Sequence, residues 1–153
     1  MTVVERIREL LESRGISYEL QEHQAVFTSQ QAADVRGTSL ESGAKALICK
    51  CDDKMNLFVM PANRRLASKA IRKNYGWKKI RFATPEEVLE LTTLKPGSIP
   101  PFGSLFSLKT WCDSRMGDPG LINFNAGCHS TSISMNFSDY LEAENPFVGS
   151  IAE

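Results

Sequence analysis

The sequence predicts an α+β fold: a single domain in which a mixed β-sheet is flanked by helices. The chain has 153 residues, a length at which one hydrophobic core can be complete. Segments with helical periodicity alternate irregularly with segments of strand-like alternation, which favours a mixed architecture. No linker, internal repeat or low-complexity segment divides the chain. Residues 1–153 are therefore predicted to form one domain, with 145–153 as a tail.

The N-terminal part predicts two capped helices on either side of a short strand. A Thr-x-x-Glu capping box at Thr2 begins a helix that ends at Gly15. A Thr-x-x-Gln box at Thr28 begins a second helix through Val35. Residues 16–20, between the two helices, alternate like a strand.

The rest of the chain predicts shorter elements of both kinds. Strands are expected over residues 44–51, 55–60, 79–82, 105–112, 121–125 and 131–135, and helices over 63–75, from Thr84 onward, and over 138–141. The segment from Lys95 to Gly103 is rich in proline and glycine, so it cannot be regular structure.

The composition is that of an ordinary soluble globular protein. Hydrophobic residues make up 42% of the chain and charged residues 24%, and the formal net charge is zero. No apolar run approaches the roughly 20 residues needed to cross a bilayer. Glu5 and Glu9 interrupt the N-terminal segment, which argues against a secretory signal. We therefore expect a cytoplasmic protein with no membrane partner.

The four cysteines do not predict a metal centre. Cys49 and Cys51 form a C-x-C pair, whereas zinc sites usually contain C-x-x-C pairs or paired histidines. Cys112 and Cys128 have no cysteine near them in the sequence. Thiols stay reduced in the cytosol. The sequence thus predicts free thiols, no metal ion and no cofactor.

Basic residues are concentrated in one stretch. Between Lys54 and Pro85 there are nine Lys or Arg residues and no Asp or Glu. On the predicted helix over 63–75, four basic residues lie opposite the hydrophobic face: Arg65, Lys69, Arg72 and Lys73. Such a face suits a polyanionic partner, so these four are predicted to contact nucleic acid. A merely solvated basic surface is the alternative.

Two features could bind and cleave an ester. Lys45 begins a predicted strand between Ala44 and Ala46, so its stem is packed while its ammonium group can hold a phosphate. A snorkelling lysine at a strand end is the alternative. The glycines of the Gly97–Gly103 loop let a ligand approach the backbone, whose N–H groups could stabilise an oxyanion. The alternative for this loop is a rigid connector.

A third candidate is the segment between two predicted strands that contains His129. This histidine could position water or contact a small amino acid, or it could be an exposed turn residue. Cys128 precedes it, but adjacent residues in a strand point in opposite directions and cannot form a thiol–imidazole pair. His23 precedes a predicted helix and is expected to be structural or at a cleft edge. Neither a G-x-S-x-G elbow nor a P-loop is present.

Taken together, these segments resemble a known family. The order is H-x-x-x-x-T, then G-A-K-A-L, V-x-P-A-N-R-R-L, G-x-x-x-P-x-G and F-N-A-G. This order resembles the YbaK-type aminoacyl-tRNA deacylases, which are similar to the editing domain inserted in bacterial prolyl-tRNA synthetase. The resemblance covers residues 16–141. It implies a partly barrel-like α+β fold and hydrolysis of the ester that joins a wrong amino acid to the 3′ end of tRNA.

The resemblance also implies roles for individual residues. Lys45 would bind the terminal phosphate or orient the adenosine, and the backbone from Gly97 to Pro101 would hold the aminoacyl group. The other residues predicted to contact the substrate are Phe27, Thr28, Phe102, Gly103 and His129. The commonest substrate of the family is tRNA-Pro carrying alanine or cysteine. No protein nucleophile is needed, because a bound water can attack with help from the neighbouring ribose hydroxyl.

Alternatives to this hypothesis stay open. A module of the same fold could bind tRNA ends, or an aminoacyl-tRNA synthetase, without hydrolysis. A zinc-dependent hydrolase would need a ligand set that the cysteine spacing does not provide. Residues 98–100, Ser-Ile-Pro, also depart from the glycine-rich or threonine-containing loop common in the family. The resemblance therefore leaves the preferred amino acid open.

Overall fold

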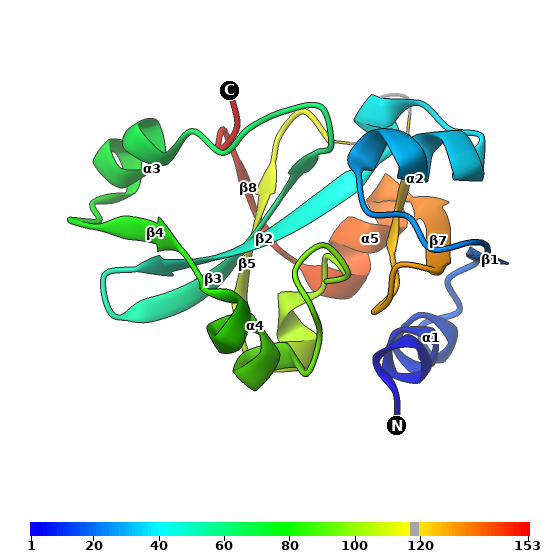
Figure 1. The fold of residues 1–153 in the computed structure, drawn as a ribbon. Helices are drawn as coiled ribbons and strands as arrows, with labels where there is room; N and C mark the ends of the chain where they lie inside the picture. The colour runs from blue at the N-terminus through cyan, green and yellow to red at the C-terminus, as the bar shows by residue number, and fades with distance from the viewer. Residues whose placement is uncertain (117–119) are drawn as a thin grey trace.

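The computed structural model describes residues 1–116 and 120–153, which form two β-sheets surrounded by helices (Figure 1). The strands are β1 (Glu19–Glu22), β2 (Ala44–Cys51), β3 (Lys54–Pro61), β4 (Ile80–Phe82), β5 (Lys109–Asp113), β6 (Leu121–Asn125), β7 (Thr131–Asn136) and β8 (Phe147–Gly149). The α-helices are α1 (Val3–Ser13), α2 (Ser29–Arg36), α3 (Ser68–Tyr75), α4 (Pro85–Thr92) and α5 (Phe137–Glu144); the short 3-10 helices are η1 (Leu40–Ser42) and η2 (Gly103–Phe106).

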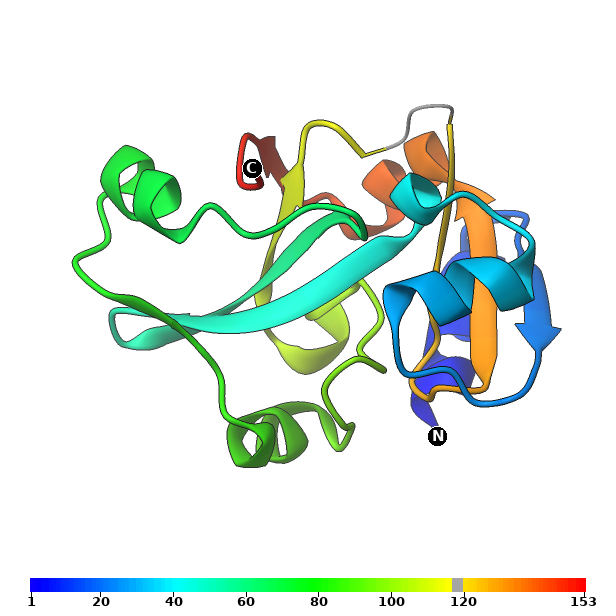
Figure 2. The same ribbon diagram turned by 45° about the horizontal axis from the view of Figure 1, so that its top comes forward.

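The two sheets differ in size and meet at one point. The larger has five strands in the order β4-β2-β3-β5-β8, and the smaller has three in the order β1-β7-β6. Strands β2 and β3 form a long antiparallel hairpin (Figure 2), and β5 pairs with β3 in parallel. Gly43, just before β2, forms a parallel bridge with Asn123 of β6. The predicted α+β class with a mixed sheet is confirmed, but the two sheets do not close into a barrel.

The hairpin strands carry a core on each face, because successive side chains of a strand point to opposite sides. Leu57 and Val59 belong to the larger cluster, which includes residues from the smaller sheet, α1 and α5. Phe58 and Met60 belong to a second cluster, which also contains Ile71 of α3. This alternation explains why nearly the whole of β3 is buried.

Two sequence predictions fail for one reason. Residues 145–153 are not a tail, because β8 pairs with β5 and Ile151 is fully buried. The helix predicted from Asn63 begins only at Ser68, because Leu66 forms an antiparallel bridge with Ala152. The C-terminus therefore holds the chain before α3 in an extended form. Local periodicity cannot show a pairing between segments so far apart in sequence.

The three helix starts predicted at Thr2, Thr28 and Thr84 are confirmed. Thr2 caps α1, and full capping boxes form at Thr28 and at Thr84. The strand predicted over 105–112 begins later, at Lys109, because η2 occupies the residues before it. Among the residues that the structure describes, no helix is long and apolar enough to span a bilayer.

Candidate functional site

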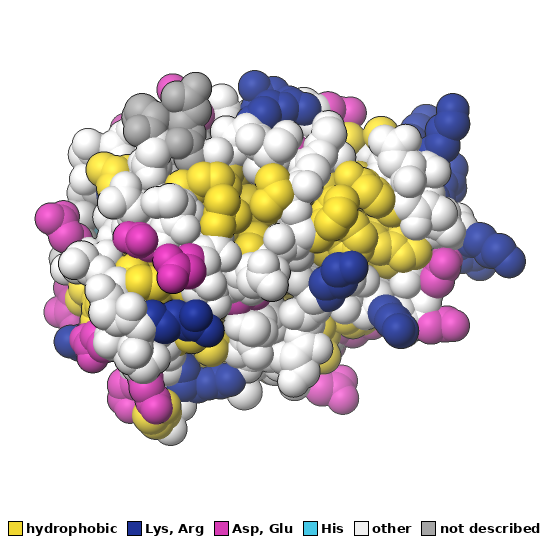
Figure 3. Space-filling model, turned by 180° about the vertical axis from the view of Figure 1, so that it is seen from behind, with side chains coloured by type: hydrophobic (Ala, Val, Ile, Leu, Met, Phe, Trp, Pro, Cys, Tyr) yellow, Lys and Arg dark blue, Asp and Glu magenta, His cyan; other side chains and the backbone are white. Residues whose placement is uncertain are grey.

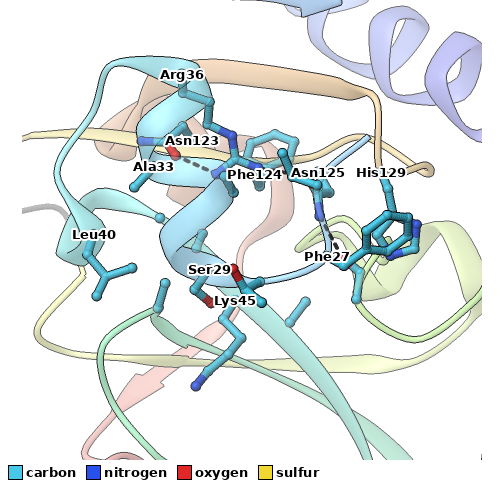
Figure 4. A pocket seen from close by; sticks show the side chains of 18 of the residues that line it. Phe27, Ser29, Ala33, Arg36, Leu40, Lys45, Asn123, Phe124, Asn125 and His129 are labelled. Atoms are coloured by element: carbon cyan, nitrogen blue, oxygen red, sulfur yellow. Dashed lines mark hydrogen bonds between the residues drawn. The ribbon is translucent and has the colours of Figure 1, made fainter. Parts of the chain in front are cut away.

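A pocket of about 160 Å³ lies where the two sheets meet, next to α2 (Figure 4). Five of the predicted site residues line it: Phe27, Thr28, Lys45, Gly97 and His129. The small side chains of Ala33, Ala44 and Ala62 form part of the wall. Gly43 is needed at the junction, since a Cβ there would lie only 3.1 Å from the Cβ of Ala62. The lysine and the glycine loop, far apart in sequence, thus share one cavity.

Lys45 is the cation at one side of this pocket. Its stem is partly buried in β2 and its ammonium group donates a hydrogen bond to the backbone carbonyl of Arg64. Burial, followed by the nearby charge of Arg65, lowers the pKa of Lys45. The ammonium group therefore lies between the cavity and the basic segment that precedes α3, where it can meet a ligand that reaches both.

The Gly97–Gly103 loop has two backbone donors to spare. The N–H groups of Ser98, Phe102 and Gly103 already donate to other protein groups, and prolines have no N–H. Within the described residues, the loop N–H groups that donate to no protein acceptor are those of Gly97 and Ile99. Both residues line the pocket. These two N–H groups could stabilise charge on a carbonyl oxygen.

The second half of the loop is structural and does not reach the pocket. The carbonyl of Pro101 accepts a hydrogen bond of 2.6 Å from the Tyr140 hydroxyl. Phe102 is fully buried and packs edge-on against Phe124 and Tyr140. Gly103 donates its N–H to a threonine hydroxyl of β5. Phe102 and Gly103 are both buried, and neither is among the described residues that line the pocket, so direct substrate contact by them stays a prediction.

Two rings form the rim of the pocket on the side of the loop. Phe27 and His129 lie with their ring centroids 4.9 Å apart, and Phe27 is 74% exposed. A Cβ added to Gly97 would lie 3.3 Å from Nε2 of His129, so the imidazole sits against the loop. Figure 4 shows both rings on the far side of the cavity from Lys45. An exposed aromatic pair here could stack on a base.

No sequence motif indicated the arginine at the pocket floor. Arg36, at the end of α2, donates to Asn123 (2.7 Å), Asn125 (2.8 Å) and Ser132 (2.8 Å). Burial lowers the pKa of Arg36 to about 10. Among the described residues, no carboxylate lies within 4.0 Å of this guanidinium group. The pocket therefore contains a cation whose partners are all neutral.

A signal for this floor is present in the sequence. In Ile122-Asn123-Phe124-Asn125, the two asparagines alternate with large hydrophobic residues. One face of a buried strand is therefore polar, and such a face needs hydrogen-bond partners. Arg36, at the end of a predicted helix, is a candidate partner, but only the fold brings it to β6.

The predicted tRNA-binding residues lie outside the pocket. Arg65, Lys69, Arg72 and Lys73 are exposed and line no part of the cavity. Basic side chains project from the end of the molecule that carries α3 and β4, beside a hydrophobic patch, as seen from behind in Figure 3. Arg72 also lines a separate depression with four further charged residues: Lys50, Asp52, Lys79 and Arg81. Lys45 bridges the two regions through the carbonyl of Arg64.

The remaining predicted candidates have structural contacts. Cys128 lies in a turn, not in a strand as assumed, because β6 ends at Asn125 and β7 begins only at Thr131. Burial would raise its pKa, but hydrogen bonds with Thr131 and Ser130 lower it overall. His23 lies 2.7 Å from the Ser132 hydroxyl, below the pocket floor. Within residues 1–116 and 120–153, no three His, Cys, Asp or Glu side chains are grouped so as to hold a metal ion.

The profile of the aminoacyl-tRNA editing domain matches residues 23–143 of this sequence. The chain belongs to the aminoacyl-tRNA editing domain family. All the residues that line the pocket fall within the matched residues. The resemblance to YbaK-type proteins that the motifs indicated is thereby confirmed.

Individual relatives agree with this assignment. The chain is 31% identical over 147 residues to the "Multifunctional Ser/Thr-tRNA deacylase ProXp-y" of Escherichia coli K12, covering 93% of this chain and 88% of the relative. It is 27% identical over 106 residues to a proline–tRNA ligase of Staphylococcus epidermidis, a match to 18% of the ligase. A solved structure described as a candidate trans-editing enzyme for prolyl-tRNA synthetase superposes with a TM-score of 0.87 at 24% identity, covering 100% of this chain and 98% of the other. That last likeness concerns the fold.

Proposed function

We propose that this editing-family protein is a trans-acting deacylase that hydrolyses the ester of mischarged tRNA. The observation that carries the proposal is the shared pocket of Lys45 and the free N–H groups of Gly97 and Ile99. A cation suits the phosphate that precedes the terminal adenosine, and two backbone donors suit the ester carbonyl. Lys45, Gly97 and Ile99 line the same cavity, so one ligand that carries both groups can meet them together.

In the proposed mechanism, water attacks the ester carbonyl without a protein nucleophile. Lys45 holds the 3′-terminal nucleotide, and the adenine can stack on the ring pair of Phe27 and His129. The N–H groups of Gly97 and Ile99 donate to the oxygen on which negative charge develops, and an oxyanion donor is typically worth about 3 kcal/mol. The water, oriented by the neighbouring ribose hydroxyl, adds to the carbonyl carbon, and the ester oxygen leaves with a proton.

We propose that the amino acids removed are small and that serine and threonine are preferred among them. A cavity of about 160 Å³ admits only a small side chain. The Arg36 guanidinium carries more N–H donors than the three that its protein contacts use. A hydroxyl can accept from a spare donor, whereas the methyl group of alanine cannot. The E. coli relative is named a Ser/Thr-tRNA deacylase. Alanine and cysteine on tRNA-Pro, expected from the sequence, stay a prediction.

We further propose that the exposed basic residues of α3 and the segment before it contact the tRNA backbone. Among the described residues, none of Arg65, Lys69 and Arg72 has a carboxylate within 4.0 Å, so their charge is available. Neutralising all three should weaken tRNA binding and reduce its salt dependence by about one unit of slope per lost phosphate contact. An unchanged slope in a filter-binding titration would place the tRNA on another face.

A panel of charged tRNAs tests the activity. tRNA-Pro carrying Ser, Thr, Ala, Cys or Pro is incubated with the protein, and release of the amino acid is followed. We expect hydrolysis of the seryl and threonyl forms first, and a loss of about 100-fold in Lys45→Ala, because the terminal nucleotide is then no longer positioned for attack. Lys109→Ala, which removes an exposed lysine of β5 far from the pocket wall, is the matched control.

The panel also separates the enzyme from a silent binding module. A module would bind the charged tRNA with an affinity that depends on Lys45 but would release no amino acid. Binding without turnover across all five aminoacyl forms would therefore overturn the deacylase proposal. Equal turnover in Lys45→Ala and wild type would remove the lysine from the mechanism.

A further inference from the structure

Arg36 is connected to the glycine loop by a directed chain of hydrogen bonds. Its Nη2 donates to Oδ1 of Asn125, and Nδ2 of Asn125 donates to the backbone carbonyl of Gly97 over 2.6 Å. Because a guanidinium group only donates, it fixes which end of the Asn125 amide faces the loop. The amide NH₂ must then point to Gly97. The position of the Gly97 carbonyl thus depends on a residue 61 positions away in sequence.

The other two bonds of Arg36 lead away from the loop. Nη1 donates to Asn123, whose amide NH₂ donates to the Ser42 hydroxyl before β2. Nε donates to the Ser132 hydroxyl, which also lies 2.7 Å from Nε2 of His23. These bonds hold the planar fork of the guanidinium in one orientation. A lysine ammonium at this position could not reproduce that fixed geometry.

This arrangement is poorly suited to stability. A partly buried cation surrounded by neutral acceptors loses hydration without gaining a counter-charge, and burial lowers the pKa of Arg36 accordingly. The loop that it reaches contains the two unused N–H donors of Gly97 and Ile99. A second bond to the same loop, from the Gly127 N–H to the Ser98 carbonyl, starts just after the end of β6. The loop is therefore held at the carbonyls of Gly97 and Ser98, next to the N–H groups that are proposed to bind the oxyanion.

We propose that Arg36 is a positioning residue for deacylation, acting through Asn125 to hold the Gly97 carbonyl and so to aim the N–H groups of Gly97 and Ile99 into the pocket. This role rests on the proposed function, but it concerns the geometry of the loop and not the binding of tRNA. Loss of the chain should reduce kcat and leave KM for charged tRNA nearly unchanged. A displacement of about 1 Å at a reacting group can reduce the rate 100-fold.

Four variants test the proposal. Arg36→Lys keeps the charge and loses the fork, and Asn125→Ala removes the link to Gly97. Ser132→Ala removes the hydrogen bond from Arg36 Nε, which does not lead to the loop. Ser132 itself is not among the residues that line the pocket. Arg6→Lys changes another arginine that donates to a backbone carbonyl, here that of Leu105, away from the pocket. Each is measured for kcat and KM on the best substrate of the panel, and for amide hydrogen exchange at Ser98 and Gly127, whose N–H groups are hydrogen-bonded to the loop.

We expect Arg36→Lys and Asn125→Ala each to reduce kcat by about 30- to 100-fold, with KM within about threefold of wild type. The kcat of the double variant should lie within about threefold of the kcat of the less active single variant, because the effects of residues that act along one route are not additive. Amide exchange at Ser98 and Gly127, whose N–H groups donate to the carbonyls of Lys95 and Ser98, should accelerate about tenfold or more in both single variants and stay unchanged in Ser132→Ala and Arg6→Lys, a difference typical of local loosening.

Three results would overturn the proposal: multiplicative losses in the double variant, a change in KM instead of kcat, or unchanged exchange at the loop. Equal losses in Arg6→Lys would also overturn it, since the effect would then be general to buried arginines. The exchange measurement needs no substrate. If wild type released no amino acid from any tRNA, the proposed function would fail, while accelerated exchange would still support the link between Arg36 and the loop.

Discussion

Two charges of this molecule, Asp113 and Arg36, have opposite surroundings. Asp113, at the end of β5, is completely buried and accepts hydrogen bonds from the backbone N–H groups of Ile151 and Ala152. It also accepts from the Arg115 N–H, and the Arg115 side chain lies 3.7 Å away. Arg36 has three neutral acceptors and, among the described residues, no carboxylate within 4.0 Å.

The difference separates a structural charge from a functional one. Asp113 is fully satisfied, and its partners are the C-terminal residues that pair with the segment before α3. Its contacts therefore stabilise the fold. Arg36 is electrostatically incomplete and borders the cavity. Incomplete sites of this kind are tolerated where function needs them.

The largest effect on stability is expected at Asp113. Asp113→Ala leaves two buried backbone N–H groups without an acceptor and frees Arg115 from its carboxylate. Removing one partner of a buried charged network costs about 3–5 kcal/mol. Chemical denaturation followed by circular dichroism measures the loss. Asp53→Ala, at an exposed turn, is the control and should stay within about 0.5 kcal/mol of wild type.

Arg36→Met should show the opposite profile. Three hydrogen bonds are lost, but so is the cost of burying an unpaired cation, so the free energy of unfolding should change by only about 1 kcal/mol. Turnover should fall about 100-fold, because the loop loses its anchor. Urea unfolding and turnover, measured on the same preparation, show whether Arg36 affects turnover more than stability. A stability loss as large as that of Asp113→Ala would erase the distinction between the two charges.

The same comparison shows what the sequence could predict. Capping boxes, strand alternation and the motif order depend on neighbouring residues, and they predicted the helix starts, the hairpin of β2 and β3, and the shared cavity of Lys45 and Gly97. Contacts that close over long distances were not predictable. The C-terminal pairing with Leu66 is one example.

The site was predicted incompletely for the same physical reason. The motif includes Phe102 in the glycine loop, but its side chain is fully buried and packs against Phe124 and Tyr140. Arg36 carries no motif, and its partners come from β6 and β7. Only the packing of α2 on the smaller sheet shows that this arginine completes the pocket floor.

The smallest effect on stability is expected when Arg36 is given a charged partner, as Asp113 has in Arg115. Asn123→Asp places a carboxylate at the acceptor of Arg36 Nη1, and the Ser42 hydroxyl, 2.8 Å from Nδ2 of Asn123, can turn to donate to it. A charge-assisted bond is stronger than a neutral one, so we expect a gain of about 1 kcal/mol in the free energy of unfolding at pH 7. The gain should disappear as the pH falls below about 4, because a paired aspartate stabilises only while it is ionised.

The same variant should be a poorer enzyme. A carboxylate beside Arg36 draws its spare N–H groups away from the substrate, so seryl-tRNA hydrolysis should fall several-fold while the loop anchor at Asn125 stays in place. Urea unfolding at pH 7 and at about pH 3, below the pKa of a free aspartate, together with turnover, measures both changes. A variant that is less stable than wild type at pH 7 would show that the arginine is already compensated by its neutral partners, and the contrast with Asp113 would then lie in position alone.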